Sequence, residues 1–443
     1  MTLHSPPVLP QPVFNANSTL FQNIGLLKVA ETATRAHGDK VVIRVSDTRD
    51  LYLLSGSDSV NYWRGNQPQF QTDLGDIASN AKITRLLLGQ ELTETRWAEV
   101  WNVTVARLTS VTRQFDRWLD RALAQASAAL VEDLPTDGRA VDLRDICRDW
   151  SIRAVCPAVF GTSLDTDEIA QGISDVEAFY FVMSTRDSAE TADHSRLPEY
   201  LAARGFLDRI MTVALHNSQP EDETLIAQIN AVIPGDVPLA DRLNLLRPTV
   251  GRMITEKLNI GGLSLLWTLS HLARDPALVV DIQDELRGKD IYALADEDTP
   301  ITFSTVREGL RLYPELPFIY RIASQDMTVG SLQVPARATV VFAPWLVQRD
   351  SKYWADPSSF DGRRFLGLDP GRDCYFPFGV GPHTRSRGRF ILHQITIALR
   401  AICAQTRFAL SPDCPRGNLH PLLRSALIPR GPVAVCFRPA TDG

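Results

Sequence analysis

Charged side chains in the C-terminal third of the chain have a spacing that suits a buried ion-pair network. Glu308 and Arg311 stand three residues apart, which places both side chains on one face of a helix. Arg364 follows further along, and a second guanidinium can bond to the same carboxylate. A surface ion pair within one helix has the same local spacing. The residues alone therefore leave open whether these three side chains form a structural triad.

Downstream, a glycine-rich segment can bring the backbone close to a flat ligand. Phe378-Gly-Val-Gly381 has two glycines one residue apart, and glycine lacks the side chain that would hold a ligand away. His383, Arg385 and Arg387 follow. Arginine stays protonated and offers only hydrogen-bond donors, so Arg385 and Arg387 can bind a phosphate or carboxylate but cannot ligate a metal. The alternative is that they fill the space left by a lost ligand.

Taken in order, these patterns resemble the cytochromes P450. Glu308-Gly-Leu-Arg311 is similar to the E-x-x-R helix of that family, and residues 360–365 are similar to the segment that supplies the third member of its charged triad. The resemblance implies that Glu308, Arg311 and Arg364 form this triad. It also implies that Arg321 occupies the position of an arginine that pairs with a heme propionate.

The glycine-rich segment resembles the heme-binding loop F-G-x-G-x-H/R-x-C-x-G, but its cysteine is missing. Counting from Phe378 places Arg385 at the cysteine position and Arg387 at the last glycine, while His383 matches a residue that contacts a heme propionate. In this family a cysteine thiolate binds the iron and helps to cleave the O–O bond, which arginine cannot do. Cys374 lies eleven residues before Arg385, so an exchange of ligand would require a rebuilt loop.

The oxygen-activating motif of the family, A-G-x-[D/E]-T-T, is altered as well. Aligned on Asp275-Pro276, it corresponds to residues 256–261, with Asn259 at the acidic position and Ile260 at the threonine position. Neither side chain can relay protons to bound dioxygen. The resemblance thus implies a family member without monooxygenase activity.

The elements that position these residues are predicted from hydrophobic periodicity and turn residues. The predicted elements are β-rich parts at about 20–75 and 325–345, a hairpin at 39–45 and 50–54, mostly helical structure over 77–313, and helices at 97–126, 249–274, 276–286 and 302–313. An irregular loop with the degenerate heme-binding motif at 343–389, a final long helix at 390–404 and an edge strand at 433–437 complete the prediction. The resemblance implies the fold class: mainly α with small β-sheets, the cytochrome P450 fold, in a single domain over 1–443 shaped as a triangular helical prism.

Composition and charge argue against several other classes of protein. With 44% hydrophobic and 22% charged residues the chain is typical of globular proteins. A net charge of -6 without a Lys/Arg block indicates no nucleic-acid partner and no membrane contact. The six cysteines lack C-x-x-C spacing, so free thiols are expected and no metal site is. The first seventeen residues show no signal-peptide pattern, so a cytoplasmic protein is expected.

The resemblance implies a function carried by the scaffold and assigns no catalytic residue. The first expectation is a heme-free auxiliary protein that activates a biosynthetic enzyme, such as a glycosyltransferase of natural-product biosynthesis. The alternative is a non-monooxygenase enzyme that uses the cavity, with or without heme, for cyclisation, dehydration or isomerisation. The expected partners are a protein and a small-molecule ligand in the emptied cavity. No cofactor is expected; the alternative is a heme that is bound without a thiolate ligand.

Overall fold

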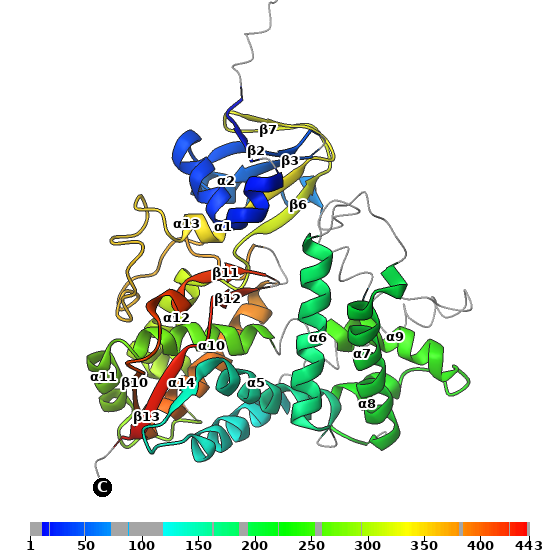
Figure 1. Ribbon diagram of the computed structural model, residues 1–443, viewed down its shortest axis with the longest axis vertical. Helices are drawn as coiled ribbons and strands as arrows, with labels where there is room; N and C mark the ends of the chain where they lie inside the picture. The colour runs from blue at the N-terminus through cyan, green and yellow to red at the C-terminus, as the bar shows by residue number, and fades with distance from the viewer. Residues whose placement is uncertain are drawn as a thin grey trace, which may run out of the picture. The chain divides into compact units, whose positions relative to one another are not determined.

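The computed structural model shows a mainly helical chain with small β-sheets, which confirms the predicted fold class (Figure 1). The residues that the structure describes are 11–16, 18–47, 49–71, 87, 118–161, 164–185, 194–219, 221–252, 259–293, 295–380, 384–424 and 426–440. Of residues 18–24, 181, 184–185, 248–252, 259–260 and 384–387 only the backbone is described. The chain divides into a sheet unit (Met1–Ala81, Arg311–Ser359 and Asp369–Arg385) and a helical unit (Lys82–Leu310, Phe360–Leu368 and Ser386–Gly443).

The sheet unit contains a six-stranded mixed sheet. Its strands lie in the order β1 (Val13–Asn15), β2 (Lys40–Ser46), β3 (Arg49–Leu54), β9 (Thr339–Phe342), β6 (Ile319–Ala323) and β4 (Phe70–Gln71). β2 and β3 form the predicted antiparallel hairpin, and β3 pairs with β9 in parallel. A separate hairpin, β7 (Met327–Val329) with β8 (Leu332–Val334), confirms strands in the predicted 325–345 part.

Helices occupy much of the segment that was predicted to be β-rich. Helix α1 spans Ser18–His37 and α2 spans Ser57–Gly65, so the prediction for residues 20–75 is wrong at both places. Leu26, Val29, Ala30 and Ala33 of α1 are buried, and their spacing is that of one apolar helix stripe. Burial of this apolar stripe stabilises a helix at a place where a β-rich segment was predicted.

An aromatic cluster forms the centre of the sheet unit. Trp63 of α2 stacks on Phe342 of β9, with ring centroids 4.2 Å apart and planes 15° apart. Phe70 of β4 meets Phe342 edge to face at 5.3 Å. These three buried rings join α2, β4 and β9 into one core.

The helical unit is built from long amphipathic helices and one central buried helix. They are α5 (Leu143–Phe160), α6 (Thr166–Thr185), α7 (Pro198–Asn217), α8 (Leu225–Asn230), α9 (Leu239–Arg252), α10 (Asn259–Leu272), α11 (Pro276–Leu286) and most of α12 (Pro300–Leu312) and α14 (Thr384–Gln405). The prediction of a helix at 276–286 is confirmed by α11, in which the Asp275 side chain accepts a hydrogen bond from Leu278 N and caps the first turn. The helix predicted at 302–313 corresponds to α12, which begins two residues earlier and ends one residue earlier. Of the helix predicted at 97–126, residues 118–126 are described and are helical.

Helix α10 is the central element of this unit. Residues 261–270 are all buried, as expected for a helix that is apolar on every side. Glycines permit close contacts: a Cβ atom placed on Gly262 would lie 2.8 Å from the Cys147 carbonyl oxygen of α5, and one on Gly309 of α12 would lie 2.4 Å from Thr268 Oγ1. Of the helix predicted over 249–274, residues 249–252 lie in α9 and residues 259–272 in α10, while residues 253–258 lie outside the described part.

Two small sheets complete the helical unit. β13 (Ala434–Pro439) lies between β10 (Thr406–Leu410) and β5 (Ala140–Asp142), and β11 (Pro421–Leu423) pairs with β12 (Leu427–Pro429). The strand predicted as an edge strand at 433–437 is therefore central. Its pairing with β5, nearly 300 residues earlier, is a long-range contact that local sequence cannot indicate.

Candidate functional site

Glu308 of α12 binds Arg364 inside the helical unit. Arg364 Nε lies 3.0 Å from Oε1 and 3.1 Å from Oε2 of Glu308, and the Asp361 backbone N–H donates to the same Oε1 at 2.9 Å. The Glu308 side chain is fully buried and that of Arg364 is 10% exposed. A buried carboxylate needs such partners, because an unpaired charge in the interior is very costly. This pair therefore fixes residues 360–368 against α12.

Arg311, one turn further along α12, binds backbone carbonyls of the sheet unit. Its guanidinium donates to Gln348 O and Pro357 O, both at 2.7 Å, and to Ser359 O at 3.1 Å, and it lies 5.2 Å from the Trp354 ring centroid. Three carbonyl acceptors satisfy a fully buried guanidinium. Arg311 thus organises the irregular segment after α13 (Pro344–Val347).

Gln348 connects this segment to the start of the glycine-rich loop. Its Nε2 donates to Arg311 O at 2.9 Å, and its Oε1 accepts from Phe376 N at 2.8 Å. Leu316 N donates to Pro377 O at 3.1 Å, and Gly379 has a φ of 83°, a conformation that favours glycine. The loop entry is therefore held at several points. Residues 381–383, including the predicted propionate contact His383, lie outside the described residues.

Arg385 and Arg387 lie in the first turn of α14, which begins at Thr384. The prediction that the loop continues to residue 389 and the helix begins at 390 is wrong by six residues. Arginine and serine tolerate a helix well, and only Gly388 carries a helix-interior penalty, of about 1 kcal/mol. The side chains of Arg385 and Arg387 lie outside the described residues, as do those of Asn259 and Ile260, whose backbone opens α10.

Arg321 of β6 carries a half-buried cation. Its Nη1 donates to Tyr320 O at 2.7 Å, and its guanidinium lies 5.0 Å from the Trp63 ring centroid. Burial lowers the pKa of Arg321 to about 10. No carboxylate of the described residues forms an ion pair with it. An anion beside Arg321 would relieve this desolvation, which is the property expected of a propionate contact.

Burial raises the pKa of four of the six cysteine thiols. Cys374 Sγ donates to Gly371 O at 3.2 Å, and burial together with the nearby Asp373 raises the pKa of its thiol. A neutral thiol in a turn is the opposite of a metal-bound thiolate. Burial also raises the pKa of Cys147, Cys156 and Cys403. These four thiols therefore lack the anionic character of a thiolate ligand.

Gln394 of α14 is a buried polar residue that the sequence analysis missed. Its side chain is fully buried, and neither amide atom has a hydrogen-bond partner among the described residues. A Cβ atom placed on Gly261 would lie 2.7 Å from both amide atoms, so the amide packs flat against α10. Gln394 shares its helix face with the buried Ile391, Ile395 and Ala398, a periodicity that could have shown that it points inward.

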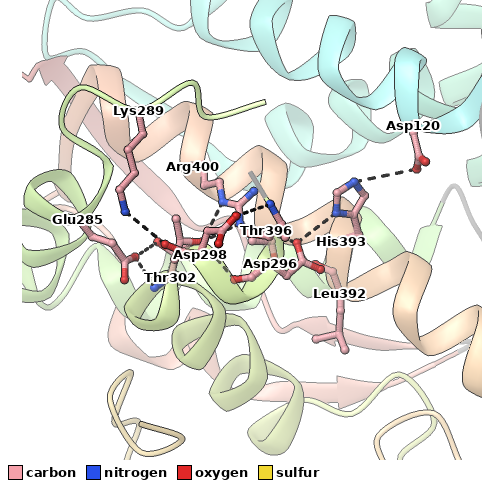
Figure 2. Close-up of polar contacts among 12 residues, drawn as sticks. Asp120, Glu285, Lys289, Asp296, Asp298, Thr302, Leu392, His393, Thr396 and Arg400 are labelled. Atoms are coloured by element: carbon pink, nitrogen blue, oxygen red, sulfur yellow. Dashed lines mark hydrogen bonds and ion pairs between the residues drawn. The ribbon is translucent and has the colours of Figure 1, made fainter. Parts of the chain in front are cut away.

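A second polar network anchors α14 (Figure 2). Arg400, fully buried, donates to Thr299 Oγ1 at 2.6 Å and to Ala295 O at 2.7 Å, while His393 Nδ1 lies 3.1 Å from Asp296 Oδ1. At the other end, the Glu285 carboxylate accepts the backbone N–H of Thr302 at 2.9 Å. The bond from Glu285 satisfies a backbone N–H group in the first turn of α12, and the bonds of Arg400 and His393 hold α14 in place. No local sequence pattern indicates this network, which joins residues more than 100 positions apart.

The described residues were compared with the patterns of metal sites and of membrane-spanning helices. In the described ranges, no group of three or more His, Cys, Asp or Glu side chains is arranged to hold a metal ion. No helix of the described part is long and apolar enough to cross a bilayer.

Comparison with known proteins finds a similarity to cytochromes P450 over part of the chain. Residues 262–384 match the family model described as Cytochrome P450. The chain is 32% identical over 163 residues to cytochrome P450 71D94 of Mentha gracilis, covering 35% of this chain and 32% of that protein. It is 27% identical over 183 residues to the mitochondrial 25-hydroxyvitamin D-1 alpha hydroxylase of Rattus norvegicus, covering 39% and 36% of the two chains. The chain thus matches about a third of the length of these relatives, and the findings support membership of the cytochrome P450 superfamily.

Proposed function

We propose that this member of the cytochrome P450 superfamily is not a monooxygenase and serves as a heme-free auxiliary protein that activates a biosynthetic enzyme, such as a glycosyltransferase. The proposal rests on Arg385, which the family resemblance aligns with the thiolate ligand. Arg385 lies in the first turn of α14, and a guanidinium has no lone pair for iron.

The preserved framework supports a role for the scaffold itself. The buried contacts of Glu308 with Arg364, and of Arg311 with three carbonyls, are complete although the chemical motifs are replaced. Loss of one partner from such a contact would leave a buried charge unpaired and would destabilise the fold. A fold kept intact without its reactive ligand is suited to presenting a surface to a protein partner.

The absorption spectrum of protein produced with excess heme precursor tests the first half of the proposal. We expect no Soret band, before or after reduction under carbon monoxide. A thiolate-type shift of the reduced carbon monoxide complex would show that a cysteine reaches the iron and would refute the proposal.

The auxiliary role needs a separate assay. We expect a glycosyltransferase encoded beside this gene to gain activity when the protein is added in equimolar amount. An unchanged rate, despite a folded protein, would refute this role. A point variant of the scaffold provides the control: Glu308→Gln, destabilised by about 3–5 kcal/mol, should stimulate only under conditions in which circular dichroism shows that it is folded.

A second function is supported by Arg321. Its desolvated guanidinium, without an ion-pair carboxylate among the described residues, would bind an anionic group of heme or of a small ligand. Such a protein could catalyse cyclisation, dehydration or isomerisation without oxygen activation. Heme titration distinguishes the two functions: a Soret band of the non-thiolate type that weakens in Arg321→Gln would favour this second function.

A further inference from the structure

The sheet of β10, β13 and β5 has a face turned toward solvent that none of the features above uses (Figure 1). Arg438 of β13 stands directly opposite Arg407 of β10, and both side chains are exposed. Two residues further along, Cys436 stands opposite Ala409. Phe437 is fully buried, so its neighbours on either side point away from the core. We call the surface formed by Arg407, Ala409, Cys436 and Arg438 the arginine face.

The two arginines of this face repel each other. Like charges directly opposite on neighbouring strands destabilise a sheet. In the part of the chain that the structure describes, no carboxylate forms an ion pair with Arg407 or Arg438. Asp137, in the adjacent turn, faces Arg139 instead, with Oδ1 3.9 Å from Nε. The face therefore carries two positive charges at a cost in stability, and such costs are typical of functional sites.

Gly138 helps to position one of the two guanidinium groups. A Cβ atom placed on Gly138 would lie 3.2 Å from Nη2 and 3.4 Å from Cζ of Arg438, so the guanidinium rests against this glycine. Gly138 has a φ of 83°, and its N–H donates to Phe437 O at 3.1 Å. A guanidinium that already rests on the backbone loses less side-chain entropy when it binds an anion.

The rest of the face is lined by small side chains. Ala409, Cys436 and Ala140 form one row across the three strands. This row has no large apolar side chain of the kind that enters a bilayer surface. Attachment to anionic lipids by charge alone typically uses about four to eight basic residues. A protein carboxylate fits the face better, because a guanidinium binds it through two parallel hydrogen bonds.

We propose that the arginine face binds an acidic segment of a protein partner, with one carboxylate on Arg407 and one on Arg438. The backbone of that segment lies over Ala409 and Cys436, where small side chains permit close approach. The two carboxylates also relieve the repulsion between the guanidinium groups. This site rests on the proposed function, in which the protein acts by contact with a partner.

Fluorescence anisotropy of a labelled hexaglutamate peptide, titrated with the full chain in about 50 mM salt, tests the proposal. We expect binding that weakens as salt is added, and no binding of hexaglutamine. Arg407→Gln and Arg438→Gln should each weaken hexaglutamate binding about two- to five-fold, the range of an exposed ion pair. Both should also raise the urea midpoint by removing the repulsion. Arg35→Gln, at an exposed position of α1, should leave the affinity unchanged.

The thiol of Cys436 reports where the peptide binds. Cys436 and Cys374 are both half-buried, and Cys374 belongs to the sheet unit. Saturating hexaglutamate should slow the reaction of Cys436 with maleimide and leave that of Cys374 unchanged, as followed by mass spectrometry of tryptic peptides. Equal rates for Cys436 with and without the peptide would place the binding elsewhere and overturn the proposal.

Three further results would overturn it. One is hexaglutamate affinity that is the same in the double variant Arg407→Gln/Arg438→Gln and the unaltered chain. Another is the absence of binding up to about 5 mM. The third is stronger binding to vesicles with about 30% phosphatidylserine, lost in the double variant, which would assign the face to a membrane. The peptide assay contains no glycosyltransferase, so its failure beside a positive stimulation assay would reject the arginine face and leave the auxiliary role intact.

Discussion

Replacing Gln394 with methionine is expected to stabilise the protein, although it removes a polar group. Both amide atoms of Gln394 are buried and lack a partner among the described residues. A buried polar group without hydrogen bonds costs about 1–3 kcal/mol, and a volume-conserving replacement costs less than about 1.5 kcal/mol. The Gln394→Met variant should therefore gain about 1 kcal/mol in free energy of unfolding.

Gln348 provides a matched control, because it is the same residue type and also fully buried. Its amide bonds to Arg311 O and Phe376 N, so Gln348→Met leaves a carbonyl and an N–H unpaired. We expect this variant to lose about 2–4 kcal/mol. Urea titration, followed by fluorescence and circular dichroism, compares the two variants with the unaltered chain.

Opposite signs for the two variants would support the reasoning. Destabilisation of Gln394→Met by 1 kcal/mol or more, on the order of a lost hydrogen bond, would refute it. Gln394 would then have a partner that the chain does not supply, such as an ordered water molecule in the space beside Gly261.

Three further predictions concern packing, the buried ion pair and the thiols. Gly172→Ala should destabilise the protein by about 1–3 kcal/mol, because the added Cβ would lie 2.0 Å from the buried Phe206 ring. Gly205→Ala should stabilise it by about 0.5–1 kcal/mol, because no atom lies within 4 Å of the added Cβ and alanine favours a helix. Equal urea midpoints for the two variants would contradict this prediction. Glu308→Gln leaves Arg364 without its buried counter-charge and should cost about 3–5 kcal/mol, and an unchanged midpoint would show that the pair is dispensable. Maleimide labelling of the native protein at about pH 8 should modify at most the three half-buried cysteines. Burial raises the pKa of the other three thiols and keeps them protonated, so they should not react. Modification of all six cysteines, detected by mass spectrometry, would show that these three thiols are not buried.

Several elements could be predicted from sequence because their signals are local. Asp275-Pro276 marks the start of α11 with a capping side chain and a proline in the first turn. The hairpin of β2 and β3 follows from β-rich runs separated by a short turn. The spacing of Glu308, Arg311 and Arg364, read through the family resemblance, indicated residues that the structure places in buried contacts.

Other features depend on contacts between distant parts of the chain. The edge strand predicted at 433–437 is central because β5 pairs with it, and the segment predicted to be β-rich contains α1 because an apolar stripe there is buried. Gln394 has ordinary neighbours in sequence, and only packing against Gly261 makes its amide unusual. The arginine face likewise brings Arg438 against Gly138, which comes from a distant part of the chain.

The sequence by itself therefore predicted an arginine at the thiolate position, through the family resemblance, and the type of most helices, because both predictions use residue order and short-range periodicity. Tertiary structure decided which charges are buried, where α14 begins, and which amide lacks a partner. These properties arise from how much solvent the surrounding chain excludes, a quantity that no local pattern contains.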